Sequence, residues 1–163
     1  MALVGAVIGI IGLFMKALTS PGADALPAVS EAVKAQDPNA AVPESLPTIW
    51  SGLDTWAKVV LVLMIIAVVA LAVTGIRSAL MGKAQSSVVA AIGVVLFVYA
   101  IVKWMEASDK ASDLAGVFAQ MNEAGAVPEA YSVSPGVIGF ALLWIGTALV
   151  AVGGGLGLRS KSS

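Results

Sequence analysis

Few side chains in this sequence are suited to chemistry. The candidates for acid–base or nucleophilic catalysis are hydroxyl groups and exposed carboxylates such as Asp54, Glu106 and Asp109. Such catalysis needs a nucleophile within reach of a base, and the spacing of these residues suggests no such pair. The sequence contains no His and no Cys, which removes the commonest general base, the commonest metal ligand and every thiolate nucleophile. We therefore predict a protein that is not an enzyme and that binds no cofactor or metal.

The composition is typical of a membrane protein. Hydrophobic residues make up 59% of the 163 positions and charged residues only 12%, against about 45–50% and about 25% in ordinary soluble domains. A single domain of this size could not bury so much apolar surface in water, so lipid is the expected solvent. The net charge of −1 argues against a nucleic-acid partner. The expected partners are membrane lipids and other integral membrane subunits.

Four apolar segments are candidates to cross a membrane, since a span needs about 20 mainly apolar residues. We predict spans at residues 2–18, 56–77, 85–103 and 135–158. The first is the weakest, because Lys16 ends its apolar run, although a Lys side chain can extend toward the interface. A cleaved signal peptide is the alternative for this segment, but no basic residue precedes the run. The predicted fold is all-α: an integral membrane four-helix bundle with a small extracytoplasmic cap that contains an amphipathic helix.

The distribution of charge predicts the orientation. All ten acidic residues lie in segments 19–55 and 104–134, whereas the short loop 78–84, the tail 159–163 and their edges carry only basic charge. Basic residues favour the cytoplasmic side, so both termini are expected in the cytoplasm of a bacterium, across its plasma (inner) membrane; chance is the alternative for such short segments. The predicted interface anchors are Trp50, Trp56, Trp104 and Tyr131 outside, and Arg77, Lys83, Arg159 and Lys161 inside.

The two outer segments contain helical patterns. A short helix is expected at residues 28–36 after Pro27, and the second span is expected to begin early, near Thr48. Gly125 is a plausible helix stop, and Ser134-Pro135 resembles the start of the fourth span. An apolar face of helical spacing, which either packs on the chain itself or docks a partner, is formed by Leu114, Val117, Phe118 and Met121.

Glycines recur at close-packing spacing in the first and fourth spans. Small residues let helix backbones approach each other in lipid, where no hydrophobic drive acts between helices. The two stripes pack either within the bundle or against another subunit. They are Gly5, Gly9 and Gly12 in the first span, and Gly139, Gly146, Gly153 and Gly157 in the fourth.

The absence of ionisable residues inside the spans argues against a pump, an ion-coupled transporter or a charged pore. Only a few hydroxyls, such as Tyr99 and Thr147, offer polar atoms there. The leading hypothesis is a non-catalytic accessory, assembly or stabilising subunit of a larger membrane complex of transporter or respiratory type. The alternatives are a self-assembling pore or holin-like protein, and a lipid-binding membrane bundle.

Overall fold

The computed structural model describes residues 1–40, 42–77 and 82–159, with the side chains of residues 76, 77 and 159 left aside. Most of the predicted loop 78–84, the tail beyond Arg159 with Lys161, and the side chains of Arg77 and Arg159 therefore lie outside the description. The chain is mostly helical, at 73%. In chain order its elements are α1 (Ala2–Leu13), β1 (Leu18–Thr19), the 3-10 helix η1 (Ala23–Ala25), α2 (Leu26–Gln36), α3 (Thr55–Arg77), α4 (Lys83–Glu123), β2 (Ser134–Pro135) and α5 (Val137–Arg159).

Three helices in the described residues are long and apolar enough to cross a membrane, namely α3, α4 and α5. This supports the prediction of a membrane protein. The first predicted span, 2–18, is longer than the helix that forms: α1 ends at Leu13 and is only about 18 Å long. Its chain turns at Phe14 and becomes extended, because the backbone of residues 15–19 forms hydrogen bonds with two other segments.

A small hydrogen-bonded ladder lies beyond the end of α1. Ile49 N–H donates to the Met15 carbonyl at 3.0 Å and Ala17 N–H to the Pro47 carbonyl at 2.8 Å. On the other side β1 pairs antiparallel with β2, in the register Leu18 to Pro135. The ladder ties the end of α1 to the start of α5 and to the proline-rich loop.

This ladder explains two wrong helix starts. Ser134-Pro135 belongs to β2 rather than to the fourth span, and α5 begins at Val137. The segment from Thr48 is a turn, and α3 begins only at Thr55. There the Asp54 carboxylate accepts a hydrogen bond from Ala57 N–H at 2.7 Å, which caps the free donors of the first turn.

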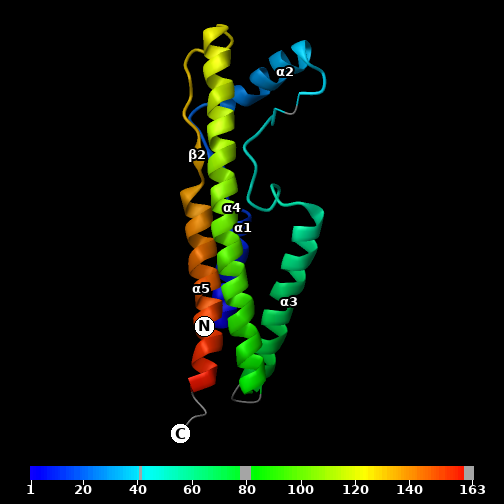
Figure 1. Cartoon of the computed structure of the whole chain (residues 1–163), viewed down its shortest axis with the longest axis vertical. Helices are drawn as coiled ribbons and strands as arrows, with labels where there is room; N and C mark the ends of the chain where they lie inside the picture. The colour runs from blue at the N-terminus through cyan, green and yellow to red at the C-terminus, as the bar shows by residue number, and fades with distance from the viewer. Residues whose placement is uncertain (41, 78–81, 160–163) are drawn as a thin grey trace.

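The third span and the outer amphipathic helix are one continuous helix, not two elements. The α4 helix has 41 residues, a length of about 62 Å, and it forms the long axis of the molecule (Figure 1). Residues 94–115 contain neither Gly nor Pro, so no residue breaks the helix between the two predicted parts. It ends at Glu123, and Gly125 follows with φ of +72°, which confirms the predicted stop.

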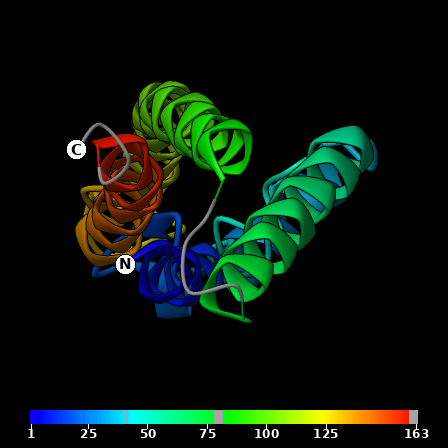
Figure 2. The ribbon, with the colours of Figure 1, turned by 90° about the horizontal axis from the view of Figure 1, so that it is seen from below.

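The half of the molecule that contains α1, α3, the amino-terminal part of α4 and α5 is built around α5. Helices α1 and α4 both pack closely on α5, and α1 runs antiparallel to it, so that the amino end of α1 and the carboxyl end of α5 point the same way (Figure 1). The α3 helix lies to one side of this group, as the view along the axis shows (Figure 2).

The carboxyl-terminal half of α4 is covered by α2 and the loops. The short helix expected at 28–36 forms as α2, with Pro27 in its first turn. Its first residues Leu26 and Val29 are fully buried in the same apolar cluster as Leu114 and Phe118, while its remainder projects away from α4 (Figure 1). Lys34 and Glu44 form an exposed ion pair of 2.6 Å, and this ammonium holds the pKa of the Glu44 carboxyl below its ordinary value.

Candidate functional site

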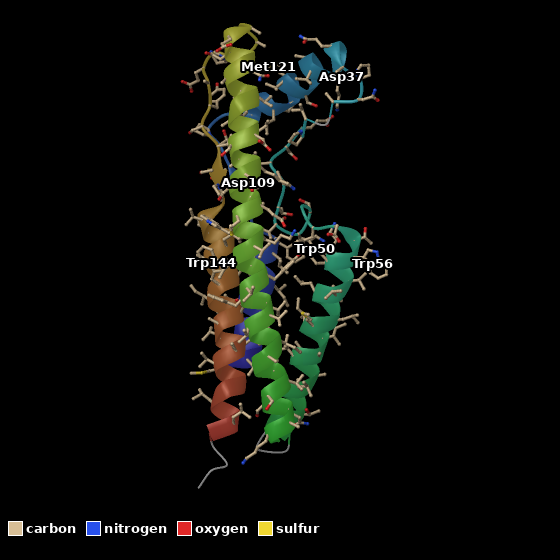
Figure 3. All side chains as sticks on the ribbon, in the orientation of Figure 1. Asp37, Trp50, Trp56, Asp109, Met121 and Trp144 are labelled. Atoms are coloured by element: carbon tan, nitrogen blue, oxygen red, sulfur yellow. The ribbon has the colours of Figure 1, made fainter. Side chains whose placement is uncertain are left out.

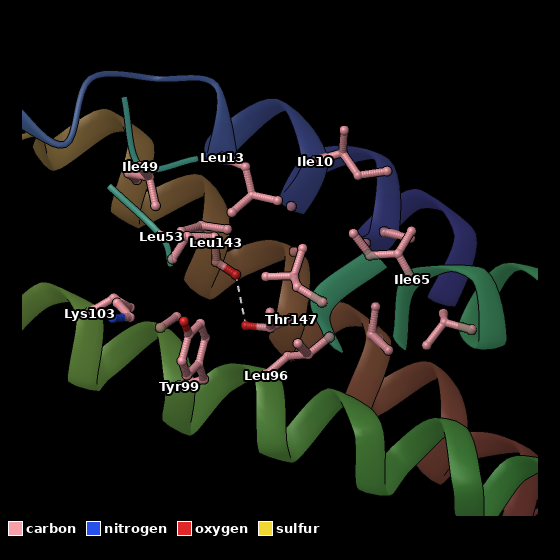
Figure 4. Close-up of a pocket in the computed structure, with 18 residues that line it drawn as sticks. Ile10, Leu13, Ile49, Leu53, Ile65, Leu96, Tyr99, Lys103, Leu143 and Thr147 are labelled. Atoms are coloured by element: carbon pink, nitrogen blue, oxygen red, sulfur yellow. Dashed lines mark hydrogen bonds between the residues drawn. The ribbon is translucent and has the colours of Figure 1, made fainter. Parts of the chain in front are cut away.

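An apolar crevice lies between α3 and the group formed by α1, α4 and α5. Its empty volume is about 610 Å³, counted with space that is open to the surroundings. All four helices and the turn at Ile49 and Leu53 contribute to its wall (Figure 4). In α3, Leu61, Val68 and Ala72 are buried, and Leu61 and Val68 line the crevice.

Gly9 forms one side of this crevice. It is buried, yet a Cβ atom placed on it would meet no atom within 4 Å. The neighbouring glycines of α1 differ, because a Cβ on Gly5 or Gly12 would collide with the backbone of α5. The missing side chain of Gly9 therefore contributes to the empty space.

Two polar side chains of α4 lie at one end of the crevice, Tyr99 and Lys103 (Figure 4). The Tyr99 hydroxyl is buried and has no hydrogen-bond partner among the described residues. The Lys103 ammonium lies 5.4 Å from the centre of the Tyr99 ring and 2.6 Å from the Glu106 carboxylate. Thr147 also reaches the crevice, but its hydroxyl donates to the Leu143 carbonyl at 2.7 Å and so is already paired.

A second cavity continues from this polar end. Its empty volume is about 400 Å³, again counted with space open to the surroundings. It shares Ile49, Leu53 and Lys103 with the first cavity and adds Glu106 and Lys110. The two cavities therefore follow one another along α4, with Lys103 between them.

Both predicted glycine stripes pack within the chain. A Cβ on Gly5 would lie 2.5 Å from the Gly146 carbonyl oxygen, and one on Gly12 would lie 2.8 Å from that of Gly139. Gly153 faces Ala2 of α1, while Gly157 faces Ser86 of α4. Of the seven residues, only Gly9 leaves open space where its side chain would be.

The outer apolar face of α4 is also used within the chain. Leu114 and Phe118 are buried, and Val117 and Met121 pack partly against the same cluster. The Phe118 ring meets the Tyr131 ring edge-on, with centroids 5.3 Å apart. Of the two expectations for this face, packing on the chain itself is what the structure contains.

The predicted interface anchors have mixed surroundings. Trp56 is 79% exposed, and Lys83 is exposed at the start of α4. The Trp50 ring lies 6.0 Å from the Phe14 ring, measured between their centroids. The Lys58 ammonium lies over the Trp50 ring, 5.9 Å from its centroid. Trp104 packs instead between helices, 5.1 Å from Phe140 and 5.2 Å from Trp144. The labelled Trp50, Trp56 and Trp144 lie at a similar height along the molecule (Figure 3), as residues of one interfacial belt would.

The residues that line the crevice suit the binding of a mostly apolar molecule. Within residues 1–40, 42–77 and 82–159 no group of three or more acidic residues is placed to hold a metal ion. The crevice offers apolar walls, one hydroxyl donor and one ammonium. Such a combination of an apolar cavity and a few polar groups at one end is typical of sites for small amphiphilic ligands.

Sequence reasoning missed this site. It noted Tyr99 only as one of several hydroxyls, and it gave no role to Lys103 or Lys110. A signal was available, because Tyr99, Lys103 and Lys110 share one helical face at spacings of four and seven residues. The empty space itself depends on where α3 lies, which no local pattern encodes.

Comparison with known proteins found no family model, no curated protein and no solved structure that matches this chain.

Proposed function

We propose that this protein is a non-catalytic membrane protein that binds a lipid-like ligand in the crevice between α3 and the other helices. The observation that carries this proposal is the apolar crevice, partly open to the surroundings, with a buried Tyr99 hydroxyl at its end that has no hydrogen-bond partner among the described residues. A buried donor without a partner costs free energy, and a void in a packed protein forfeits dispersion contacts. A ligand with a hydrocarbon chain and an acceptor oxygen removes both costs.

The test compares two variants that each replace one glycine with leucine. In Gly9→Leu the new side chain enters the crevice, whereas in Gly155→Leu it meets open space elsewhere on α5. Each protein is purified in mild detergent, and bound compounds are extracted and identified by mass spectrometry. We expect a near-stoichiometric hydrophobic compound with the wild type and Gly155→Leu, and its loss with Gly9→Leu. Equal retention by all three proteins would contradict the proposal.

The proposed setting is a bacterial plasma (inner) membrane, with α1, α3, the inner half of α4, and α5 as the four-helix bundle. In this arrangement both termini are cytoplasmic, and α2, the outer half of α4 and the loops form an extracytoplasmic cap. The acidic residues of the outer segments and the basic residues near Lys83 support this orientation. Because the chain has no Cys, single cysteines test it directly. Asp109→Cys should react with an impermeant maleimide in intact cells, and Lys83→Cys only after lysis.

An accessory, assembly or stabilising subunit of a larger transporter or respiratory complex is the second candidate. The outward face of α3 favours it, because Trp56, Leu63 and Ile66 are 79%, 60% and 57% exposed. The helix packs on its own chain by one edge only, so another membrane subunit could cover the rest. Extraction from native membranes in mild detergent, followed by sizing and mass spectrometry, should then yield a stoichiometric complex; a lone monomer would remove this candidate.

A further inference from the structure

One face of α4 changes from apolar to charged along both cavities. Leu96, Tyr99, Lys103, Glu106 and Lys110 all line them. Successive members of this set are three or four residues apart, which keeps them on one side of the helix. Over about 21 Å this face therefore presents a hydrocarbon side chain, a hydroxyl, an ammonium, a carboxylate and a second ammonium in that order.

The inner cavity suits a hydrocarbon chain. Its wall includes Leu61, Val68, Leu143 and Val150, which are 1–7% exposed. Gly9 adds depth without a side chain of its own. Such a surface offers dispersion contacts, and its one further hydroxyl, that of Thr147, already donates to the Leu143 carbonyl.

The outer cavity suits a negatively charged group. The Lys103 side chain is only 18% exposed and pairs with Glu106, whereas Lys110 has no ion pair among the described residues. The three charged groups that line this cavity therefore sum to one positive charge. An anion here would contact an ammonium that is already partly desolvated, where the interaction is stronger than at a free surface.

We propose that the two cavities together bind one glycerophospholipid, with an acyl chain in the inner cavity and its phosphate at Lys103 and Lys110 in the outer one. An ester oxygen accepts the hydrogen bond of the Tyr99 hydroxyl. This inference rests on the proposed function and specifies its ligand. The lipid comes from the leaflet whose headgroups lie at the level of Trp50, Trp56 and Trp144. Lys103 is close to this level, because it directly precedes Trp104, whose ring lies 5.2 Å from that of Trp144.

The order of the side-chain groups along α4 favours a phospholipid over other amphiphiles. Tyr99 is one helical turn, about 6 Å, deeper than Lys103, and in a phospholipid the ester oxygens likewise lie deeper than the phosphate. A fatty acid has its charge at the carboxyl itself and would leave Lys110 without a partner. A quinone or a diacylglycerol has no phosphate and would use neither ammonium.

The experiment is native mass spectrometry of the delipidated full-length protein. It is titrated with phosphatidylglycerol and, separately, with diacylglycerol of the same acyl chains. We expect one phosphatidylglycerol per chain, bound on the order of tenfold more tightly than diacylglycerol. The variant Lys103→Gln/Lys110→Gln should lose this preference while still binding diacylglycerol. Lys83→Gln, which removes an exposed charge at the other end of α4, is the matched control and should keep it.

These variants test ligand binding in the crevice and the phosphate assignment separately. If Gly9→Leu abolishes binding but the lysine variant retains an undiminished preference for phosphatidylglycerol, the crevice binds a ligand and the phosphate assignment is wrong. Equal affinity for diacylglycerol and phosphatidylglycerol in the wild type also overturns the assignment alone. If Gly9→Leu binds both lipids as the wild type does, the proposed function fails as well. Loss of phosphate preference in the lysine variant, together with loss of binding in Gly9→Leu, supports both.

Discussion

Helices α3 and α5 are both 23 residues long, yet they differ in how they pack. In α3 twelve of the eighteen residues 59–76 are Val, Leu or Ile, whereas α5 has six glycines. Nevertheless 39% of the apolar stretch of α5 is buried inside the molecule, against 17% for α3. Large apolar side chains suit a helix to lipid, but small residues let it approach other helices. Glycine content, rather than hydrophobicity, thus marks the central helix.

The largest effect is expected from a bulky side chain placed in the contact between α1 and α5. A Cβ on Gly146 would lie 2.5 Å from the Gly9 backbone nitrogen, so Gly146→Leu must push the two helices apart. We expect a loss of at least about 1–3 kcal/mol, measured as a lower thermal unfolding midpoint in detergent. Gly155→Leu has free space around its new side chain and should unfold at the wild-type temperature or above. An unchanged midpoint for Gly146→Leu would mean that α1 and α5 are not in backbone contact.

A cysteine pair sharpens the same comparison. A Cβ on Gly153 would lie 3.2 Å from the Ala2 Cβ, close to the separation of about 3.5–4.5 Å found across disulfides. We expect Ala2→Cys/Gly153→Cys to form a disulfide under mild oxidation, seen as a mobility change on non-reducing gels. The pair Leu63→Cys/Gly153→Cys, with Leu63 exposed on α3, is the control and should stay reduced. Efficient crosslinking of this control would contradict the position of α3.

Hydrogen exchange should separate α3 from α5 without any substitution. Because one edge of α3 packs and its remainder is exposed, it should open locally more often than α5. In detergent we expect α3 peptides to exchange faster than α5 peptides, and added phospholipid to slow exchange in α3 more than in α5. Equal protection of the two helices would remove the contrast. Protection by lipid confined to α5 would place the ligand elsewhere.

The smallest effect is expected at the exposed Lys34–Glu44 pair, which joins α2 to the loop that follows it. The Glu44 pKa is lowered in the folded state, so the pair stabilises the fold above the unfolded-state pKa and loses this contribution as pH falls through the folded-state value. Both side chains are exposed, so the effect is small. Limited proteolysis of the α2 loop should be slightly faster at pH 3.5 than at pH 7. Glu44→Gln should be cleaved equally at both values, once corrected for protease activity.

Much of the fold could be predicted because it depends on local physics. Long apolar runs gave α3 and α5 nearly their observed bounds, Pro27 indicated the start of α2, and Gly125 the end of α4. The glycine stripes coincide with places where the α1 and α5 backbones approach each other closely. These are properties of short segments, and free energies of transfer, capping and turn formation act over a few residues.

The tertiary structure decided what depends on distant partners. By itself the sequence determined that the chain is helical, apolar and rich in close-packing glycines. It did not determine that residues 15–19 leave the helix to pair with residues 47–49 and 134–135, because a backbone hydrogen bond carries no side-chain signature. Nor did it determine that α3 stands off from α5 and leaves Tyr99, Lys103 and Lys110 along one pair of cavities. A cavity is the space between elements, so its existence is a property of their packing and of no single segment.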